Sequence, residues 1–170
     1  MTSKHVAGPT LDEFEAARAT VAKVAQSTPM ETSRYLSSVL GSEVFLKCEN
    51  LQRTGSYKLR GAYNLMSQLT DAEKARGVVA ASAGNHAQGV ALAAKVLGIK
   101  ATIFMPVGVA LPKLQATQDY GAEVVLAGSI FNEALKAAKE FVAETGAVFI
   151  PPFDHPKVVM GQLDLFQISP

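Results

Sequence analysis

The sequence predicts an α/β fold in which an open, mostly parallel β-sheet carries helices on both faces. From Gly77 onward, short apolar segments alternate with longer amphipathic ones, which is the pattern of repeated strand–helix units. The apolar segments lack clean alternation with polar residues, and strands of that kind are buried on both faces. Gly98, Gly121 and Gly146 each follow an expected helix, where a left-handed helix end favours glycine.

The amino-terminal part begins with two expected helices. Thr10 followed by Glu13 forms a capping box, in which each residue bonds the backbone of the other, and this predicts a helix over residues 10–26. A shorter helix is expected over residues 32–40, because Gly41 follows it as a natural helix end.

A strand and a further helix come next. Residues 43–49 favour a strand, and the helix is expected from Lys58 to about residue 69. Apolar residues recur along this helix at helical spacing, which predicts one buried stripe. The stripe consists of Leu59, Ala62, Tyr63, Met66 and Leu69. We assign it to the core and give it no chemical role.

The second half alternates regularly. Strands are expected over residues 78–82, 100–105, 123–126 and 148–150, and helices over residues 85–97, 111–120 and 129–145. The sequence contains no internal repeat and no polar linker. The pair Pro151 and Pro152 is therefore the clearest candidate for a domain boundary.

Composition favours a small-molecule partner. The chain has 170 residues, 48% hydrophobic and 18% charged, and a net charge of +1. A chain with this charge balance and no cluster of basic residues lacks the positively charged patch that binds nucleic acid or a membrane surface. The single cysteine, Cys48, is expected to be a small buried hydrophobe in a reducing compartment. The start lacks a secretion signal and no apolar run reaches the ~20 residues of a membrane span, so a cytoplasmic location is expected.

Lys58 is the first candidate for chemistry. It lies within KCENLQRTGSYKLRGAYN, residues 47–64, where a polar turn opens a helix almost at the lysine. The positive end of a helix disfavours the ammonium form and lowers the pKa of an amine, as a nucleophile requires. Thr54 and Ser56 supply capping hydroxyls, and Gly61 permits close backbone approach. The alternative is a solvated surface lysine, the usual kind on a helix.

The segment SAGNHAQG, residues 82–89, is the second candidate. It follows an expected parallel strand and opens a helix, which is where open α/β sheets bind ligands. This segment could bind a carboxylate. The hydrogen-bond donors would be the N–H groups of the first helical turn, the Ser82 hydroxyl and the Asn85 amide. An ordinary turn capped by Asn85 is the alternative. His86 is either a hydrogen-bonding group over a cofactor or a simple capping residue.

Several common sites are not supported by the sequence. No second histidine or cysteine stands at ligand spacing, so we expect no metal site and no cysteine nucleophile. The glycine-rich fingerprints of dinucleotide and nucleotide triphosphate sites are also missing from the sequence.

Taken together, the two segments resemble the threonine ammonia-lyase (threonine dehydratase) family, a group of tryptophan-synthase-β-like, fold type II pyridoxal phosphate enzymes. The similarity extends through shorter motifs to Gly161 and Gln162 and covers nearly the whole chain. It implies the amino-terminal half of such a catalytic domain. Residues 1–76 and 149–170 would form a partial large domain, and residues 77–148 a small α/β domain.

The resemblance implies pyridoxal 5'-phosphate as the cofactor. Lys58 matches the lysine that holds the cofactor covalently, and Asn85 matches the asparagine that hydrogen-bonds its phenolic oxygen. Tyr57 stands where relatives usually have a phenylalanine beside the cofactor ring. Ser82, Gly84, Asn85 and His86 belong to the matching loop that receives the substrate carboxylate.

The implied reaction is β-elimination from a small amino acid. Threonine would give 2-oxobutanoate and ammonia, and serine would give pyruvate, with the freed Lys58 amine taking the Cα proton. A serine racemase-like activity is a further alternative. Relatives of that kind have a serine as second base where this chain has Ala83, which favours elimination.

The chain departs from the family after Gln162. It reads LDLFQISP over residues 163–170, whereas the family continues with a glycine-threonine turn and a helix. The resemblance therefore implies a truncated chain without the glycine-rich phosphate loop, the partner of the pyridine nitrogen and the cation ligands. The second hypothesis is a noncatalytic fragment that exposes apolar faces such as the Leu59 stripe and gives no appreciable turnover alone.

The family also suggests a homodimer or homotetramer. The sequence does not separate a biosynthetic role, serving isoleucine synthesis, from a catabolic one.

Overall fold

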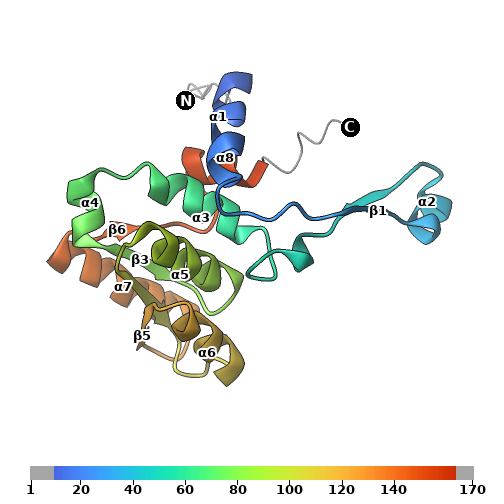
Figure 1. The fold of residues 1–170 in the computed structure, drawn as a ribbon. Coiled ribbons are helices and arrows are strands. Elements are labelled where there is room, and N and C mark those ends of the chain that lie inside the picture. The colour runs from blue at the N-terminus through green and yellow to red at the C-terminus, as the bar shows by residue number, and fades with distance from the viewer. Residues whose placement is uncertain (1–9, 164–170) are drawn as a thin grey trace, which may run out of the picture.

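The computed structural model describes residues 10–163 as an α/β fold (Figure 1). The helices are α1 (Leu11–Val21), α2 (Arg34–Leu40), α3 (Lys58–Ser67), α4 (Asp71–Arg76), α5 (Asn85–Leu97), α6 (Leu111–Asp119), α7 (Phe131–Thr145) and α8 (Pro156–Leu163), with a 3₁₀ turn η1 (Glu49–Leu51). The strands are β1 (Met30–Thr32), β2 (Phe45–Lys47), β3 (Val78–Ala81), β4 (Ala101–Met105), β5 (Glu123–Leu126) and β6 (Val148–Phe149).

The main sheet is parallel throughout, as the sequence predicts. Its four strands follow the order β5-β4-β3-β6. Val78 of β3 lies opposite Ala101 of β4 on one side and Val148 of β6 on the other. Every expected element of the second half is present, with ends within two residues of those predicted.

Both faces of this sheet are covered by helices. Val78 and Ala80 of β3 face the cluster that α3 and α5 build, whereas Val79 and Ala81 face the cluster built by α7. This alternation follows from the two-residue period of a strand, because successive side chains point to opposite faces. Small apolar residues on β3 allow helices to approach the sheet from both sides.

The apolar stripe of α3 is buried within this chain. Leu59, Ala62, Tyr63 and Met66 are all at most 6% exposed, and Leu69 packs at the edge of the same cluster. The core assignment is therefore confirmed, and the expectation that a fragment exposes this stripe is wrong. The reason is that α5 covers one side of α3, and α8, which the sequence analysis did not predict, covers another.

The amino-terminal half differs more from the prediction. Helix α1 has the expected capping box, with Glu13 accepting from the Thr10 N–H at 2.7 Å, but it ends at Val21. Strand β2 is shorter than residues 43–49 because, within residues 10–163, it pairs only with β1, an unpredicted strand, as an antiparallel ribbon. Cys48 lies at the end of this ribbon and is half-buried, so the expectation of a buried thiol is wrong.

Helix α4 was also not predicted. Its signal was present, since Thr70 and Glu73 form a second capping box like that of α1. Residues 164–170, which carry most of the departure from the family, lie outside the described residues. Within residues 10–163, no helix is long and apolar enough to cross a bilayer.

We expect Gly161→Ala to destabilise the crossing of α8 over α3. A Cβ on Gly161 would lie 2.6 Å from the Asn64 Cβ and 2.7 Å from the Arg60 carbonyl oxygen. Relief of such a clash costs about 1–3 kcal/mol of unfolding free energy, which urea denaturation measures. Gly108→Ala is the matched control, because its Cβ would meet no atom within 4 Å. Equal losses in the two variants would contradict this prediction.

Candidate functional site

Lys58 is the first residue of α3 and is half-buried. Its backbone N–H donates to the Ser56 Oγ at 3.4 Å, so one of the expected capping hydroxyls does contact the helix start. Its Nζ donates to the Pro152 carbonyl oxygen at 2.8 Å and lies 4.8 Å from the centroid of the Tyr57 ring. Because Pro152 follows β6, this contact places the Lys58 amine at the carboxyl edge of the sheet.

Residues 82–84 connect β3 to α5, and residues 85–89 begin α5, as predicted. The Gly84 N–H donates to the Ser82 Oγ at 3.2 Å, and the Asn85 side chain is exposed. A Cβ placed on Gly84 would meet no atom within 4 Å, so the space in front of the helix is open. The first N–H groups of a helix have no partner within it. The segment therefore offers hydrogen-bond donors toward an open space.

Gly89 brings the two candidate segments together. A Cβ on Gly89 would lie 2.9 Å from the Leu59 nitrogen and 3.0 Å from the Lys58 carbonyl carbon. Helix α5 therefore crosses the first turn of α3 backbone to backbone, with no side chain between them (Figure 1). The sequence analysis gave Gly89 no role, although a glycine inside a helix is a signal of close packing.

His86 faces the sheet. The side chain is buried, and its Nε2 lies 2.9 Å from the Ile150 carbonyl oxygen just past β6. Burial lowers the pKa of His86 to about 4, assisted by the Lys58 charge and opposed by the Ile150 hydrogen bond. The ring is therefore neutral near pH 7, and Nε2 donates because a carbonyl oxygen only accepts. His86 connects the start of α5 to the end of β6.

These contacts converge on one place in the sheet. Strand β3 lies between β4 and β6, and the connection through α5 runs from β3 to β4. The chain leaves β3 toward β4 on one side, whereas β6 lies on the other side of β3. The carboxyl ends of β3 and β6 therefore form a topological switch point, where open α/β sheets bind ligands. Lys58 and His86 both bond the backbone just past β6, so both lie at this point.

A buried ion pair fixes the segment before Lys58. The Arg60 Nε and Nη2 donate to the two Glu49 carboxylate oxygens at 2.8 and 2.9 Å, and the Thr28 hydroxyl donates to the same carboxylate at 2.6 Å. Burial raises the pKa of Glu49, but hydrogen bonds from Arg60 and Thr28 and the Arg60 charge outweigh it and lower the pKa overall. The pair ties η1 to α3, and the sequence analysis missed it.

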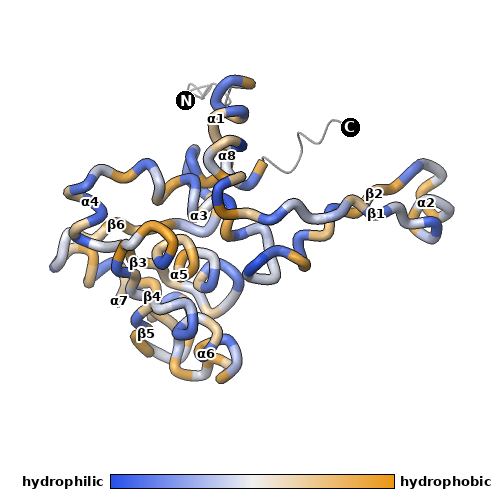
Figure 2. Tube along the Cα trace, viewed as in Figure 1, coloured by the Kyte–Doolittle hydropathy of each residue, from blue (hydrophilic) through white to orange (hydrophobic). Residues whose placement is uncertain are grey.

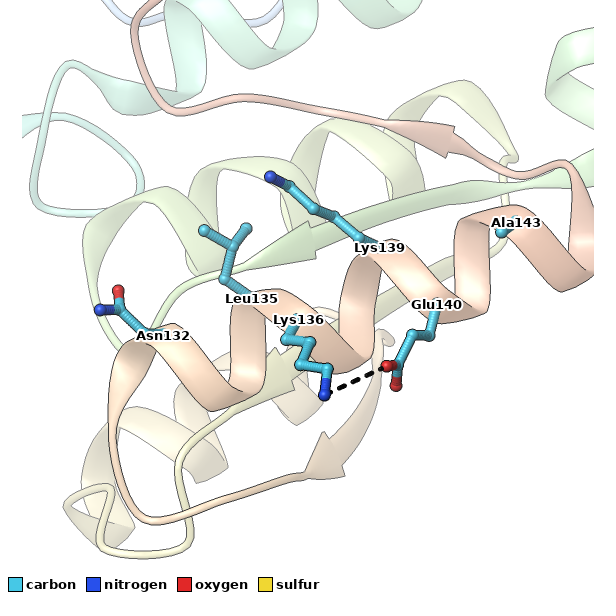
Figure 3. Close-up of a pocket in the computed structure, with 6 residues that line it drawn as sticks. All are labelled: Asn132, Leu135, Lys136, Lys139, Glu140 and Ala143. Carbon is cyan, nitrogen blue, oxygen red and sulfur yellow. Dashed lines mark ion pairs between the residues drawn. The ribbon is translucent and has the colours of Figure 1, made fainter.

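A hollow lies along α7, on the face of the sheet opposite α5 (Figure 3). Its volume is about 410 Å³, and it is lined by Asn132, Leu135, Lys136, Lys139, Glu140 and Ala143. Lys136 and Glu140 form an ion pair at 3.8 Å on the exposed side of the helix. This open groove contains none of the predicted site residues, and we do not regard it as the functional site.

Fold and site together define a class of protein: an α/β protein with a lysine amine beside a helix amino terminus at a sheet switch point. Residues 21–167 match the family model described as pyridoxal-phosphate dependent enzyme, and the chain belongs to this family. The chain is 52% identical over 153 residues to the L-threonine ammonia-lyase of Thermotoga maritima, covering 90% of this chain and 38% of that relative. It is 51% identical over 152 residues to the catabolic L-threonine dehydratase of Escherichia coli, covering 89% of this chain and 46% of that relative.

Solved structures show the same relationship. The processed form of threonine deaminase isoform 2 from Solanum lycopersicum has a TM-score of 0.83 and 43% identity, covering 93% of this chain and 45% of that chain. Maize serine racemase has a TM-score of 0.87 and 34% identity, and the match covers 93% of this chain and 48% of that chain. The chain thus spans less than half the length of these relatives.

We expect Glu49→Gln to destabilise the chain strongly. The substitution removes the buried carboxylate charge that accepts two hydrogen bonds from Arg60, and breaking a buried pair costs about 3–5 kcal/mol. Urea denaturation gives the change in unfolding free energy. Glu123→Gln is the matched control, because its 3.0 Å pair with Lys100 is exposed and should cost less than about 1 kcal/mol. A similar small loss in both variants would show that the buried pair is not a structural constraint.

We expect His86 to make stability depend on pH. Its folded pKa of about 4 lies below its ordinary value of 6.5, so the unfolded chain binds the proton more readily. The contribution of neutral His86 to the free energy of unfolding is fully present above pH 6.5 and is lost as the pH falls through 4, by at most about 3.4 kcal/mol. Unfolding measured between pH 4.5 and 7 tests this, and His86→Asn should flatten the slope. An unchanged slope in the variant would assign the effect to other groups.

Proposed function

We propose that this chain supplies the lysine-bearing half of a site that deaminates L-threonine, and L-serine as well, by β-elimination. The products are 2-oxobutanoate from threonine, pyruvate from serine, and ammonia. One observation carries the proposal: the Lys58 amine lies at the switch point of the sheet, and α5 crosses its backbone at Gly89. The activities of the T. maritima and E. coli relatives, an L-threonine ammonia-lyase and a catabolic L-threonine dehydratase, support the choice of threonine.

The residues present fit pyridoxal phosphate in part. Lys58 would hold it covalently, Asn85 would bond its phenolic oxygen, and Tyr57, 38% exposed, would flank the ring. The open space at Gly84 and the half-buried amine are consistent with a group placed between α3 and α5. When bound, the cofactor supplies a conjugated system that accepts the electrons released at Cα.

The chain's own residues would bind the substrate and move a proton. Lys58 Nζ would take the Cα proton, while the Ser82 hydroxyl and the N–H groups of Asn85 and His86 would bind the carboxylate in the open space at Gly84. The His86 side chain, neutral and bonded to Ile150, adds no charge there. The Cα proton and β-hydroxyl leave as water, and a second water releases ammonia. The reaction therefore needs no oxidant or reductant.

Racemisation of serine is a second candidate, favoured by the similarity to maize serine racemase. Racemisation needs a second group that delivers a proton to the opposite face of Cα. The position after Ser82 carries Ala83, whose methyl group can neither accept nor donate a proton. Elimination needs only one base at Cα, so we favour it.

The chain spans 38–46% of the T. maritima and E. coli relatives, and the alternative of a noncatalytic fragment stays a prediction. We propose that residues 77–148 form the small domain and that residues 1–76 and 149–170 belong to a larger one. A cytoplasmic homodimer or homotetramer, in threonine breakdown or in isoleucine synthesis, remains a prediction.

We expect pyridoxal phosphate to label Lys58 selectively. The chain is incubated with the cofactor and reduced with borohydride, and the modified lysine is identified by mass spectrometry. Lys58→Ala should remove the main labelled site, whereas Lys95→Ala, an exposed lysine on α5, should leave it. Equal labelling of exposed lysines, without preference for Lys58, would overturn the proposed site.

The turnover assay separates the two hypotheses. With cofactor and threonine, we expect no appreciable 2-oxobutanoate from the isolated chain. Steady production that falls about 10²–10⁴-fold in Lys58→Ala would instead show an autonomous enzyme, because a general base contributes about that much. Lys95→Ala again serves as the control.

A further inference from the structure

The backbone carbonyl of Pro152 accepts hydrogen bonds from two side chains. The Lys58 Nζ donates to its oxygen at 2.8 Å, and the Gln162 Nε2 donates to the same oxygen at 3.1 Å. A carbonyl oxygen has two lone pairs, so it can accept from both donors at once. Lys58 begins α3 and Gln162 lies near the end of α8, so two helices meet at this one oxygen just past β6.

Helix α8 is placed so that Gln162 reaches this carbonyl. Figure 2 shows α8 beside α1 and across α3. A Cβ placed on Gly61 would lie 2.8 Å from the Gln162 Cγ, and a Cβ placed on Gly161 would lie 2.7 Å from the Arg60 carbonyl oxygen. The two glycines therefore let the helices pack closely, and the stem of Gln162 lies directly on the first turn of α3. The sequence analysis used Gln162 only to mark the end of the family similarity.

Only one of the two donors changes when Lys58 reacts. As the neutral amine condenses with an aldehyde, a C=N bond forms, and both N–H hydrogens leave with the aldehyde oxygen as water. The nitrogen then no longer donates to Pro152. A half-buried carbonyl that loses every donor is destabilised, because it has given up its bonds to water without replacement. Gln162 leaves the Pro152 carbonyl with one donor after Lys58 has reacted.

We propose that Gln162 is a positioning residue for Lys58 and acts through the Pro152 carbonyl. It keeps this oxygen hydrogen-bonded when the amine departs, and it thereby favours release of the Lys58 amine to an aldehyde. Without Gln162, Lys58 would be the only side chain of the two left on the carbonyl, and its reaction would leave the oxygen unpaired. The inference rests on the proposed function, because it takes Lys58 as the reacting amine.

The test follows the reaction of Lys58 with a small aldehyde in the whole chain. Formaldehyde with cyanoborohydride methylates lysines through a C=N bond, and mass spectrometry gives the rate at Lys58 relative to exposed Lys95. Gln162→Met keeps the length of the side chain but removes the donor. We expect the ratio to fall about 3–10-fold, which corresponds to one hydrogen bond. Gln68→Met is the matched control, because Gln68 donates to the Asn64 carbonyl at 2.7 Å, farther along α3, and should leave the ratio unchanged.

A second measurement leaves Gln162 intact. Lys58→Ala removes the competing donor, so the bond from the Gln162 Nε2 to Pro152 should strengthen. The side-chain amide proton signals of Gln162 should then move downfield in the NMR spectrum, whereas those of Gln68 should stay in place. A purely structural role for Gln162 would instead lower the urea midpoint of Gln162→Met and leave the methylation ratio of the folded chain unchanged.

An unchanged ratio in Gln162→Met would overturn the proposal, and so would an equal fall in Gln68→Met. If Gln162→Met does not fold, the NMR measurement decides, and unmoved Gln162 signals in Lys58→Ala would count against the positioning role. Labelling by pyridoxal phosphate keeps this inference separate from the proposed function. If the methylation ratio falls as expected but the cofactor does not label Lys58, the role of Gln162 stands and the proposed function fails.

Discussion

The candidate site depends on the backbone contact between α5 and the first turn of α3. Gly89 permits it, because any side chain there would meet the Lys58 and Leu59 backbone at about 3 Å. The contact places a lysine amine beside the amino terminus of a second helix, although the two segments are well separated along the chain. Side-chain interactions alone would leave α3 free to shift along α5, whereas a backbone crossing fixes its position.

Two polar constraints hold the ends of this crossing. The Glu49–Arg60 pair, buried with the Thr28 hydroxyl, ties the turn before Lys58 to the helix that Lys58 begins. His86 ties the start of α5 to the Ile150 carbonyl. Each of these groups would be costly to bury without a hydrogen-bond partner. Relative movement of the segments would break these buried hydrogen bonds, so both contacts oppose a shift of the backbone around Lys58.

Much of the second half could be predicted because its signals are local. Buried strands between amphipathic helices, and glycines at 98, 121 and 146 with positive φ, identify elements without reference to distant residues. Helix α8 and strand β1 were missed because their stability comes from partners far along the chain. Helix α8 is stabilised by packing on Gly61 of α3, and β1 by pairing with β2. Short elements of this kind have weak intrinsic preferences, which tertiary contacts override.

The sequence by itself determined the parallel α/β class, Lys58 at the start of a helix, and the donor-rich turn at residues 82–89, because helix starts and strand ends have local chemical signatures. Only the tertiary structure decided that Gly89 joins these segments, that His86 faces Ile150, and that α5 and α8 are the helices that cover the α3 stripe. Those outcomes depend on which distant surfaces meet. A local pattern identifies a side chain as apolar or polar but does not identify its partner.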